Sequence, residues 1–163
     1  DITRTVAIGK VSSQFKKIYE IVLEAQQMAI EAVQPGISAK SVDVVARQHI
    51  KLHGFGAYFF HSLGHGLGIR IHESPLLSIR SAEILQPGNV FTIEPGIYFI
   101  PELIEKWKSE NKHNDFIDYS KIDKYRSVGG IRIEDNILIT EEGHKILGPP
   151  IPKTVEEIES ICS

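Results

Sequence analysis

The sequence predicts an α+β domain in which helices cover one face of a largely antiparallel sheet. Two stretches with helical spacing of apolar residues come first, over residues 15–33 and 38–54. Strand-like apolar runs follow at residues 89–93, continuing toward 100, and at residues 130–140. An order of one strand, two helices and then several strands is typical of this fold class.

The composition fits one globular domain and excludes several classes of protein. The chain has 163 residues, of which 42% are hydrophobic and 24% are charged. Its 18 basic and 21 acidic residues give a net charge of −3, which argues against capture of nucleic acid and against a polybasic membrane patch. No apolar run is long enough for a membrane span, and no secretory leader opens the chain. The single cysteine, Cys162, excludes an internal disulfide and a cysteine-built metal site, so we expect a reducing, cytoplasmic setting.

The first third of the chain is expected to form a strand and then the two helices. Residues 1–9 alternate in the manner of a strand. Ser12 or Ser13 offers an N-cap to the first helix, and Pro35-Gly36 ends it. Ser38 then offers an N-cap to the second helix.

The remainder is expected to form mostly strands and turns. A Gly-rich segment spans residues 58–75, and a short helix or turn is expected at 81–85. After the second long strand, a turn should return the chain as a hairpin strand at residues 144–147. Thr154 and Glu157 form a capping box that predicts a short last helix.

Residues 101–128 separate the last two long strands. This segment is polar, with Trp107, Phe116, Ile117 and Tyr125 as occasional apolar anchors. We interpret it as an insertion that carries a little helix within one domain, rather than as a separate domain.

Three of the seven histidines, His61, His65 and His72, lie close together in the Gly-rich segment. A spacing of four could place His61 and His65 on one helical face, as in zinc peptidases with a His-Glu-x-x-His motif. The neighbouring glycines disfavour a helix, however, and no glutamate lies between these histidines. A turn that leads into a strand is expected instead, with Arg70 and His72 on one face. A lone histidine is more often a core or surface residue, but this cluster, flanked by glycines, indicates a site.

Acidic residues on apolar strands form a second constellation. Glu94 and Glu134 each follow an apolar run, and Asp1 shares a face of the first predicted strand with Thr3. A charge on a half-buried strand must be paired or must bind a metal. Glu134 could pair with Arg132, and Glu94 could be a solvated strand end. Brought together, the three acids would repel one another unless a cation lay between them.

One imidazole with three carboxylates is a hard, oxygen-rich donor set. Such a set suits Mn²⁺, Co²⁺ or Fe²⁺ better than it suits a structural zinc ion, which favours Cys and His ligands. Carboxylates that bridge two ions would make a dinuclear site, which lowers the pKa of a shared water and orients it toward a carbonyl.

Four ordered blocks of the chain resemble the pita-bread metallopeptidases, which include methionine aminopeptidase, Xaa-Pro aminopeptidase and prolidase. The blocks are Asp1-Ile-Thr-Arg-Thr, His61-Ser-Leu-Gly-His65, Leu85-Gln-Pro-Gly with Thr92-Ile-Glu94-Pro-Gly-Ile-Tyr98, and Gly130-Ile-Arg-Ile-Glu134-Asp135. The chain is most similar to the prolidase branch, the Xaa-Pro dipeptidases, in Ile97-Tyr98-Phe99-Ile100, in the long insertion and in Pro152 to Glu159. The resemblance implies the pita-bread fold, hydrolysis of Xaa-Pro dipeptides that releases proline, and a homodimer.

The resemblance also implies a ligand set for two divalent ions, most simply Mn²⁺, with Co²⁺ or Zn²⁺ as alternatives. Asp1 matches the second metal-binding aspartate of the family, and Glu134 matches the second bridging acid. His65 matches the single histidine ligand. Glu94 matches the glutamate that binds one ion and takes part in proton transfer.

Four further residues carry roles by the same resemblance. His61 matches a histidine thought to stabilise the tetrahedral intermediate, and His72 matches one near the proline side of the substrate. Arg80 falls where prolidases place an arginine for the free carboxylate of the dipeptide, a task that suits a guanidinium. Arg132 is expected to orient Glu134.

One departure from the family concerns the start of the chain. The first metal-binding aspartate of the family lies upstream of Asp1, so we expect these residues to be the C-terminal part of a catalytic domain. The fold would then be incomplete at its N-terminal side. We expect this chain alone to bind metal weakly and to be inactive or nearly so, while its parent is an enzyme.

Two alternatives stay open. The parent could be an Xaa-Pro aminopeptidase that acts on longer peptides, although Arg80 and the long insertion favour dipeptides. It could also be a metal-free pseudo-peptidase that serves as a binding module, but such proteins lose their ligands, and here all the ligands that could be present are present.

Overall fold

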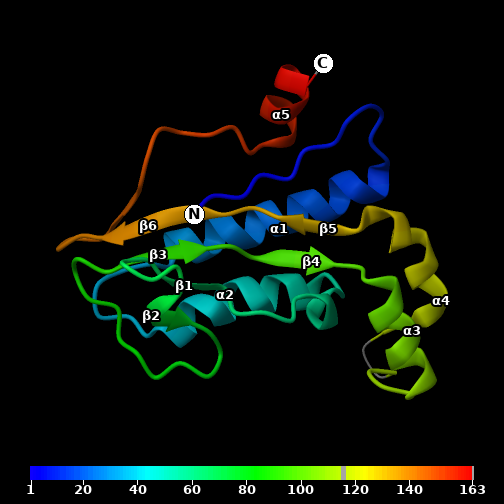
Figure 1. Ribbon diagram of the computed structural model, residues 1–163, viewed down its shortest axis with the longest axis horizontal. Helices are drawn as coiled ribbons and strands as arrows, with labels where there is room; N and C mark the ends of the chain where they lie inside the picture. Colours follow the sequence, from blue (N-terminus) through cyan, green and yellow to red (C-terminus); the bar gives the residue numbers. More distant parts are fainter. Residues whose placement is uncertain (115–116, 163) are drawn as a thin grey trace.

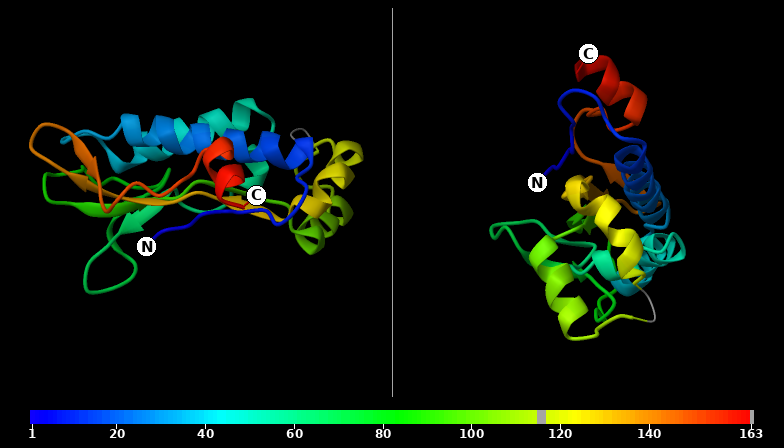
Figure 2. Two further views of the ribbon diagram at one scale, coloured as in Figure 1. Left: turned by 90° about the horizontal axis from the view of Figure 1, so that it is seen from above. Right: turned by 90° about the vertical axis from the view of Figure 1, so that its right-hand side faces the viewer.

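A layer of two helices covers one face of the sheet in the computed structural model, which describes residues 1–114 and 117–162. Helices α1 (Ser13–Glu31) and α2 (Ala39–Leu52) form that layer, and the N-terminal segment runs along the opposite side of the sheet (Figure 1 and Figure 2). The predicted α+β class is confirmed. Phe116, expected to be an anchor of residues 101–128, lies outside the described residues.

Every strand pair of the described chain is antiparallel. The five-stranded sheet has the order β2-β1-β3-β6-β7, and a two-stranded sheet pairs β4 with β5. The strands are β1 (Gly64–Gly66), β2 (Glu73–Leu77), β3 (Val90–Ile93), β4 (Gly96–Tyr98), β5 (Gly130–Arg132), β6 (Asp135–Ile139) and β7 (His144–Ile146). The strands predicted at 89–100, 130–140 and 144–147 are therefore confirmed, the first two each as a broken pair.

The two long helices begin and end where the sequence predicts. The Ser12 side chain accepts a hydrogen bond from the backbone of Phe15, and Ser38 does the same for Ser41, so each satisfies an amide left unpaired at a helix start. Gly54 follows α2 in a left-handed conformation with φ of 87°, which glycine adopts without steric cost. The fully buried side chains between helices and sheet include those of Ile18, Val22, Val42, Ala46, Ile50, Phe91 and Ile93.

Shorter helices lie at the ends of the molecule. Residues 101–128 form α3 (Pro101–Ser109), α4 (Tyr119–Ile122) and η2 (Asp123–Val128) over their described part, at the far end of the sheet (Figure 1). Another short turn of helix, η1 (Gly56–Tyr58), follows α2. Helix α5 (Val155–Cys162) starts at the predicted capping box, because Thr154 Oγ1 accepts from the Glu157 amide and the Glu157 carboxylate accepts from the Thr154 amide. None of the described helices is both long and apolar enough to cross a membrane.

The strand predicted over residues 1–9 is wrong. This segment makes only a single bridge, between Thr3 and Glu134. Side chains replace the backbone ladder: the Thr5 hydroxyl donates to the carbonyl of Arg132 and accepts from its amide, at 2.9 and 3.0 Å. The Arg4 guanidinium donates hydrogen bonds to the carbonyls of Thr3 and Glu134. A segment held by side chains follows the sheet edge without pairing regularly with it.

Two predictions near the Gly-rich segment also differ from the structure. Residues 67–72, expected to enter a strand, form an exposed loop because the β1–β2 ladder ends at the pair of Gly66 with Glu73. Residues 81–85 form no helix. Their backbone groups instead bind the entrance of α2, where the Ala39 amide donates to the Glu83 carbonyl and the Leu85 amide to the Ile37 carbonyl. The turn allowed as an alternative lies slightly earlier, between Ser78 and Ser81.

Candidate metal centre

A break in the two long strands places Glu94 and Glu134 side by side. The β3–β6 ladder ends at the pair of Ile93 with Asp135, and the β4–β5 ladder begins at the pair of Gly96 with Arg132. Pro95 lies in the gap and has no amide to donate, so the ladder cannot continue through it. The two glutamates are buried, with exposed fractions of 7% and 1%.

Strand β1 brings His65 to the same place. The Glu94 amide donates to the Leu63 carbonyl, and the His65 amide donates to the Thr92 hydroxyl. That hydroxyl in turn donates to Glu94 Oε1 at 3.1 Å. Thr92 was not among the predicted site residues, although its position two residues before Glu94 puts both side chains on the same face of an extended segment.

The ring of His65 presents one nitrogen to the acids. Its Nδ1 lies 3.2 Å from the Gly66 carbonyl, which can only accept, so we assign the proton to Nδ1. Nε2 then lies 3.2 Å from Glu94 Oε1 and 3.7 Å from Asp1 Oδ2. A backbone carbonyl that fixes the tautomer in this way is the usual support of a metal-binding histidine.

Glu134 completes the group. Ligand atoms of Asp1, His65 and Glu134 all lie within 4.8 Å of one another. Burial raises the pKa of Glu134, although Thr3 donates a hydrogen bond to its Oε2. Its Oε1 is buried and has no hydrogen-bond partner among the described residues. A buried, unpaired carboxylate oxygen beside two further acids and a ring nitrogen fits a divalent cation.

Arg132 lies near both glutamates, and its charge acts to lower the pKa of Glu134. Its ion pair is with Glu94, at 3.2 Å between Nη1 and Oε2, and its Nε donates to the Tyr98 hydroxyl at 2.6 Å. Thr3 donates the hydrogen bond that the Glu134 carboxylate accepts, and the expected role of Arg132 in orienting Glu134 stays a prediction. The strand break brings Arg132 opposite Gly96 and so within reach of Glu94 and Tyr98 across the two-stranded sheet.

A cavity of about 740 Å³ opens over this group. It is lined by Asp1, Thr3, His61, Ser62, Gly64, His65, Arg70, His72, Glu73, Ser74, Leu76, Glu94, Arg132 and Glu134. The structure thus brings together His61, His65, His72 and the three acids that the sequence singled out. Arg80 is not among the lining residues, since it lies in the turn beyond β2, whereas the exposed Arg70 is.

His61 is a neutral imidazole in this environment. Burial lowers its pKa to about 4, and its Nδ1 donates to the Ser62 carbonyl at 2.7 Å. Protonation of the ring opposes folding, so stability from this residue is present above its unfolded pKa of ~6.5 and declines as the pH falls toward 4.

We expect an NMR titration of the 163-residue chain to place the midpoint of the His61 ring near pH 4. A His61 midpoint near 6.5 would contradict the buried environment described here.

Gly64 is required for the approach of β1 to β3. A Cβ at this position would lie 1.8 Å from the Thr92 carbonyl oxygen, which is backbone and cannot move aside. Gly64→Ala should therefore destabilise the fold by at least ~1–3 kcal/mol in chemical denaturation.

Gly143→Ala is the matched control, because its Cβ would meet nothing within 4 Å and its φ is not positive. The two variants should differ clearly in their denaturation midpoints. Equal midpoints would show that β1 does not pack against β3 as described.

A second network, centred on Asp135 beside Glu134, was not predicted from the sequence. The Asp135 carboxylate is bound by Arg4 at 2.6 Å, by Lys153 at 2.7 Å and by Gln26 at 3.0 Å. It joins the N-terminal segment, α1 and the segment before α5 to the start of β6, directly after Glu134. The adjacency of Asp135 to Glu134 in the sequence was the available signal, but the partners are remote along the chain.

Comparisons with known proteins agree with this geometry. A family model described as Metallopeptidase family M24 matches residues 1–141. An Xaa-Pro dipeptidase from Pyrococcus furiosus is 47% identical over 147 residues, covering 90% of this chain and 35% of that protein. An uncharacterized peptidase, YqhT, from Bacillus subtilis is 46% identical over the same length, covering 90% of this chain and 34% of the relative. The chain thus spans about a third of the length of these curated relatives.

Solved structures give the same result. The prolidase from Pyrococcus horikoshii OT3 superposes with a TM-score of 0.76 at 42% identity, covering 94% of this chain and 37% of that one. The X-Pro aminopeptidase from Thermotoga maritima has a TM-score of 0.73 at 38% identity, covering 94% and 36%. The fold is therefore the pita-bread fold of the prolidases over the part that these residues form. The chain belongs to metallopeptidase family M24.

Proposed function

We propose that the parent of this chain is a dinuclear-metal Xaa-Pro dipeptidase, and that these residues are the C-terminal part of its catalytic domain, with an insertion at 101–128. The observation that carries the proposal is the convergence of His65, Glu94, Glu134 and Asp1 in one cavity. Relatives named Xaa-Pro dipeptidase and prolidase support the substrate class.

Asp1, His65, Glu94 and Glu134 would hold the divalent ions. When bound, the ions supply a Lewis acid that polarises the scissile carbonyl and acidifies water. Glu94 would take up the proton released in the reaction and pass it to the leaving amine. Arg132 and Tyr98 would hold that carboxylate in place through the ion pair and hydrogen bond described above.

The remaining predicted residues would serve the substrate. His72, whose ring centroid lies 4.3 Å from that of His65, would contact the proline side. His61 lines the same cavity and would stabilise the developing oxyanion. To donate from Nε2, the ring would have to move the proton that Nδ1 donates to Ser62 or bind a second one. Arg80 stays our proposed partner of the dipeptide carboxylate, and Arg70 is a second candidate because it lines the cavity.

Arg80→Ala in the parent protein should raise the KM for an Xaa-Pro dipeptide by ~10–100-fold with little change in kcat, since a charged hydrogen bond to the substrate is lost. Steady-state kinetics of Arg80→Ala beside Arg70→Ala test this assignment. An unchanged KM for Arg80→Ala with a raised KM for Arg70→Ala would transfer the role to Arg70.

We further propose that Mn²⁺ is the native metal, with Co²⁺ or Zn²⁺ as alternatives, and that the parent is a cytoplasmic homodimer. Neither nucleic acid nor a membrane is a proposed partner. Because the chain spans about a third of its relatives, we expect the 163 residues alone to bind metal weakly and to be inactive or nearly so.

The test is proline release from an Xaa-Pro dipeptide by the parent protein, with Mn²⁺ and with a chelator, beside the 163-residue chain. Metal-dependent release by the parent alone is the expected result. Turnover by the 163-residue chain near that of the parent would overturn the expected inactivity. No cleavage with any divalent metal would favour the metal-free binding module instead.

An Xaa-Pro aminopeptidase is the second candidate, supported by the similarity to the Thermotoga maritima enzyme of that name. Release of the first residue from an Xaa-Pro-Yaa tripeptide would establish it. Cleavage of the dipeptide only would exclude it.

A further inference from the structure

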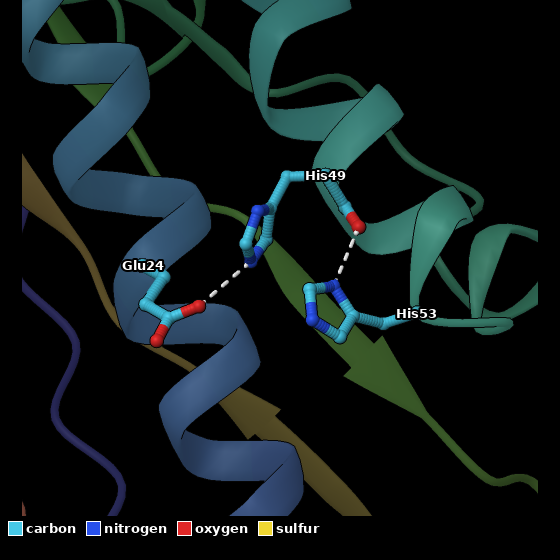
Figure 3. Close-up of side chains that lie close together, drawn as sticks. All are labelled: Glu24, His49 and His53. Carbon is cyan, nitrogen blue, oxygen red and sulfur yellow. Dashed lines mark hydrogen bonds and ion pairs between the residues drawn. The ribbon is translucent and has the colours of Figure 1, made fainter.

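A second group of metal-binding side chains lies on the helix layer, away from the cavity. Glu24 projects from α1 toward α2, where His49 and His53 are one helical turn apart (Figure 3). One ligand atom from each of the three lies within 4.8 Å of the others. Two histidines four residues apart share one face of a helix, which is a spacing that holds zinc in other proteins.

The ring of His49 presents a nitrogen that could bind a metal ion. His49 Nε2 is buried and lies 3.1 Å from Glu24 Oε2, its ion-pair partner, with no well-aligned hydrogen bond among the described residues. A cation between a buried ring nitrogen and a carboxylate oxygen that face each other in this way would bind both atoms. Burial and the neighbouring His53 also lower the pKa of His49, which favours the uncharged form of the ring that can bind a metal.

His53 has the tautomer that metal binding requires. Its Nδ1 lies 3.0 Å from the His49 carbonyl, which can only accept, so Nδ1 carries the proton and Nε2 carries a lone pair. Figure 3 shows this second nitrogen on the side of the ring that faces Glu24 and His49. A ring held by a carbonyl through one nitrogen, with the other nitrogen open, is typical of a metal ligand.

We propose that Glu24, His49 and His53 form a zinc site that ties α1 to α2. Two imidazoles and one carboxylate are the donor set of three-ligand zinc sites, with the fourth position left to water. Glu24 and His53 are exposed, so an ion can reach the site from solvent. The site lies on the helices that cover one face of the sheet, whereas the N-terminal segment that carries Asp1 lies on the other (Figure 2). It is therefore independent of the proposed function.

The experiment is zinc binding by the metal-free chain, measured by competition with a chromophoric chelator. The background is His65→Ala, which removes the histidine ligand of the cavity. One equivalent of Zn²⁺ should remain bound, and adding His53→Ala should weaken it at least tenfold. His113→Ala removes an exposed histidine elsewhere and should leave the affinity unchanged.

NMR of the otherwise unaltered chain with ¹⁵N-labelled histidine gives an answer that does not depend on the folding of His65→Ala. Zn²⁺ should shift the Nε2 resonances of both His49 and His53, and Glu24→Gln should weaken that response. Equal zinc affinity with and without His53, or Nε2 resonances of His49 and His53 that stay unmoved as Zn²⁺ is taken up, would overturn the proposal.

Discussion

Replacing His65 by alanine in the parent protein should lower kcat/KM for an Xaa-Pro dipeptide by at least ~1000-fold, a loss of about 4 kcal/mol of transition-state stabilisation. His65 is the only nitrogen donor of the predicted ligand set, and its Nε2 faces Glu94 and Asp1 directly. Its removal takes one ligand from the metal centre. With the metal bound less tightly, the carboxylates of Asp1, Glu94 and Glu134 would repel one another.

Steady-state kinetics with saturating Mn²⁺ measure this effect. His113→Ala is the control, because His113 is exposed and lies outside the cavity, and its kinetics should match those of the unaltered protein. Activity of His65→Ala within tenfold of the unaltered protein would contradict a catalytic role for the metal centre in this cavity.

Asp135→Ala should destabilise the fold by ~3–5 kcal/mol, the range for breaking a buried ion pair by removing one partner. Asp135 is 5% exposed, and its carboxylate binds Arg4, Lys153 and Gln26. Without it, two partly buried cations and the buried Gln26 amide lose their acceptor. Urea denaturation of the 163-residue chain measures the change, and the exposed Glu156→Ala should leave the midpoint almost unchanged.

The same residue gives a dependence on pH. Burial opposes ionisation of Asp135, but hydrogen bonds and charge from Lys153 and Arg4 outweigh it and hold its pKa below the usual value. The stabilisation is therefore present above the unfolded pKa, ~3.9, and is lost as the pH falls below it. Asp135→Asn should flatten that part of the stability profile. An identical acid profile in the variant would show that this network does not stabilise the fold.

The helices could be predicted well from the sequence because their signals are local. Ser12 and Ser38 cap the two helices that the apolar spacing predicts, and Thr154 caps the last helix, which the capping box predicts. The strand expected over residues 1–9 failed because alternation does not reveal whether a backbone partner exists. There, the Arg4 and Thr5 side chains form hydrogen bonds with backbone groups of Thr3, Arg132 and Glu134 instead.

The site was predictable in composition but not in its supporting contacts. His61, His65, Glu94, Glu134 and Asp1 could be chosen as unusual polar residues on apolar or Gly-rich segments, and they line one cavity. The ion pair of Arg132 with Glu94 was not predicted, since strand alternation relates Arg132 only to Glu134, while the break at Pro95 brings Glu94 within reach.

The zinc site proposed on the helix layer was also missed. His49 and His53 have the same spacing as His61 and His65, and they lie on a helix where that spacing does place two rings together. Glu24 comes from another helix, so only the packing of α1 against α2 reveals the third donor.

The most direct test of the metal centre is an anomalous difference map from a crystal of the parent protein grown with Mn²⁺. We expect a manganese peak bound by His65 Nε2 and by carboxylate oxygens of Asp1, Glu94 and Glu134. A cavity without an anomalous peak at saturating Mn²⁺, or a peak that none of these four residues touches, would contradict it.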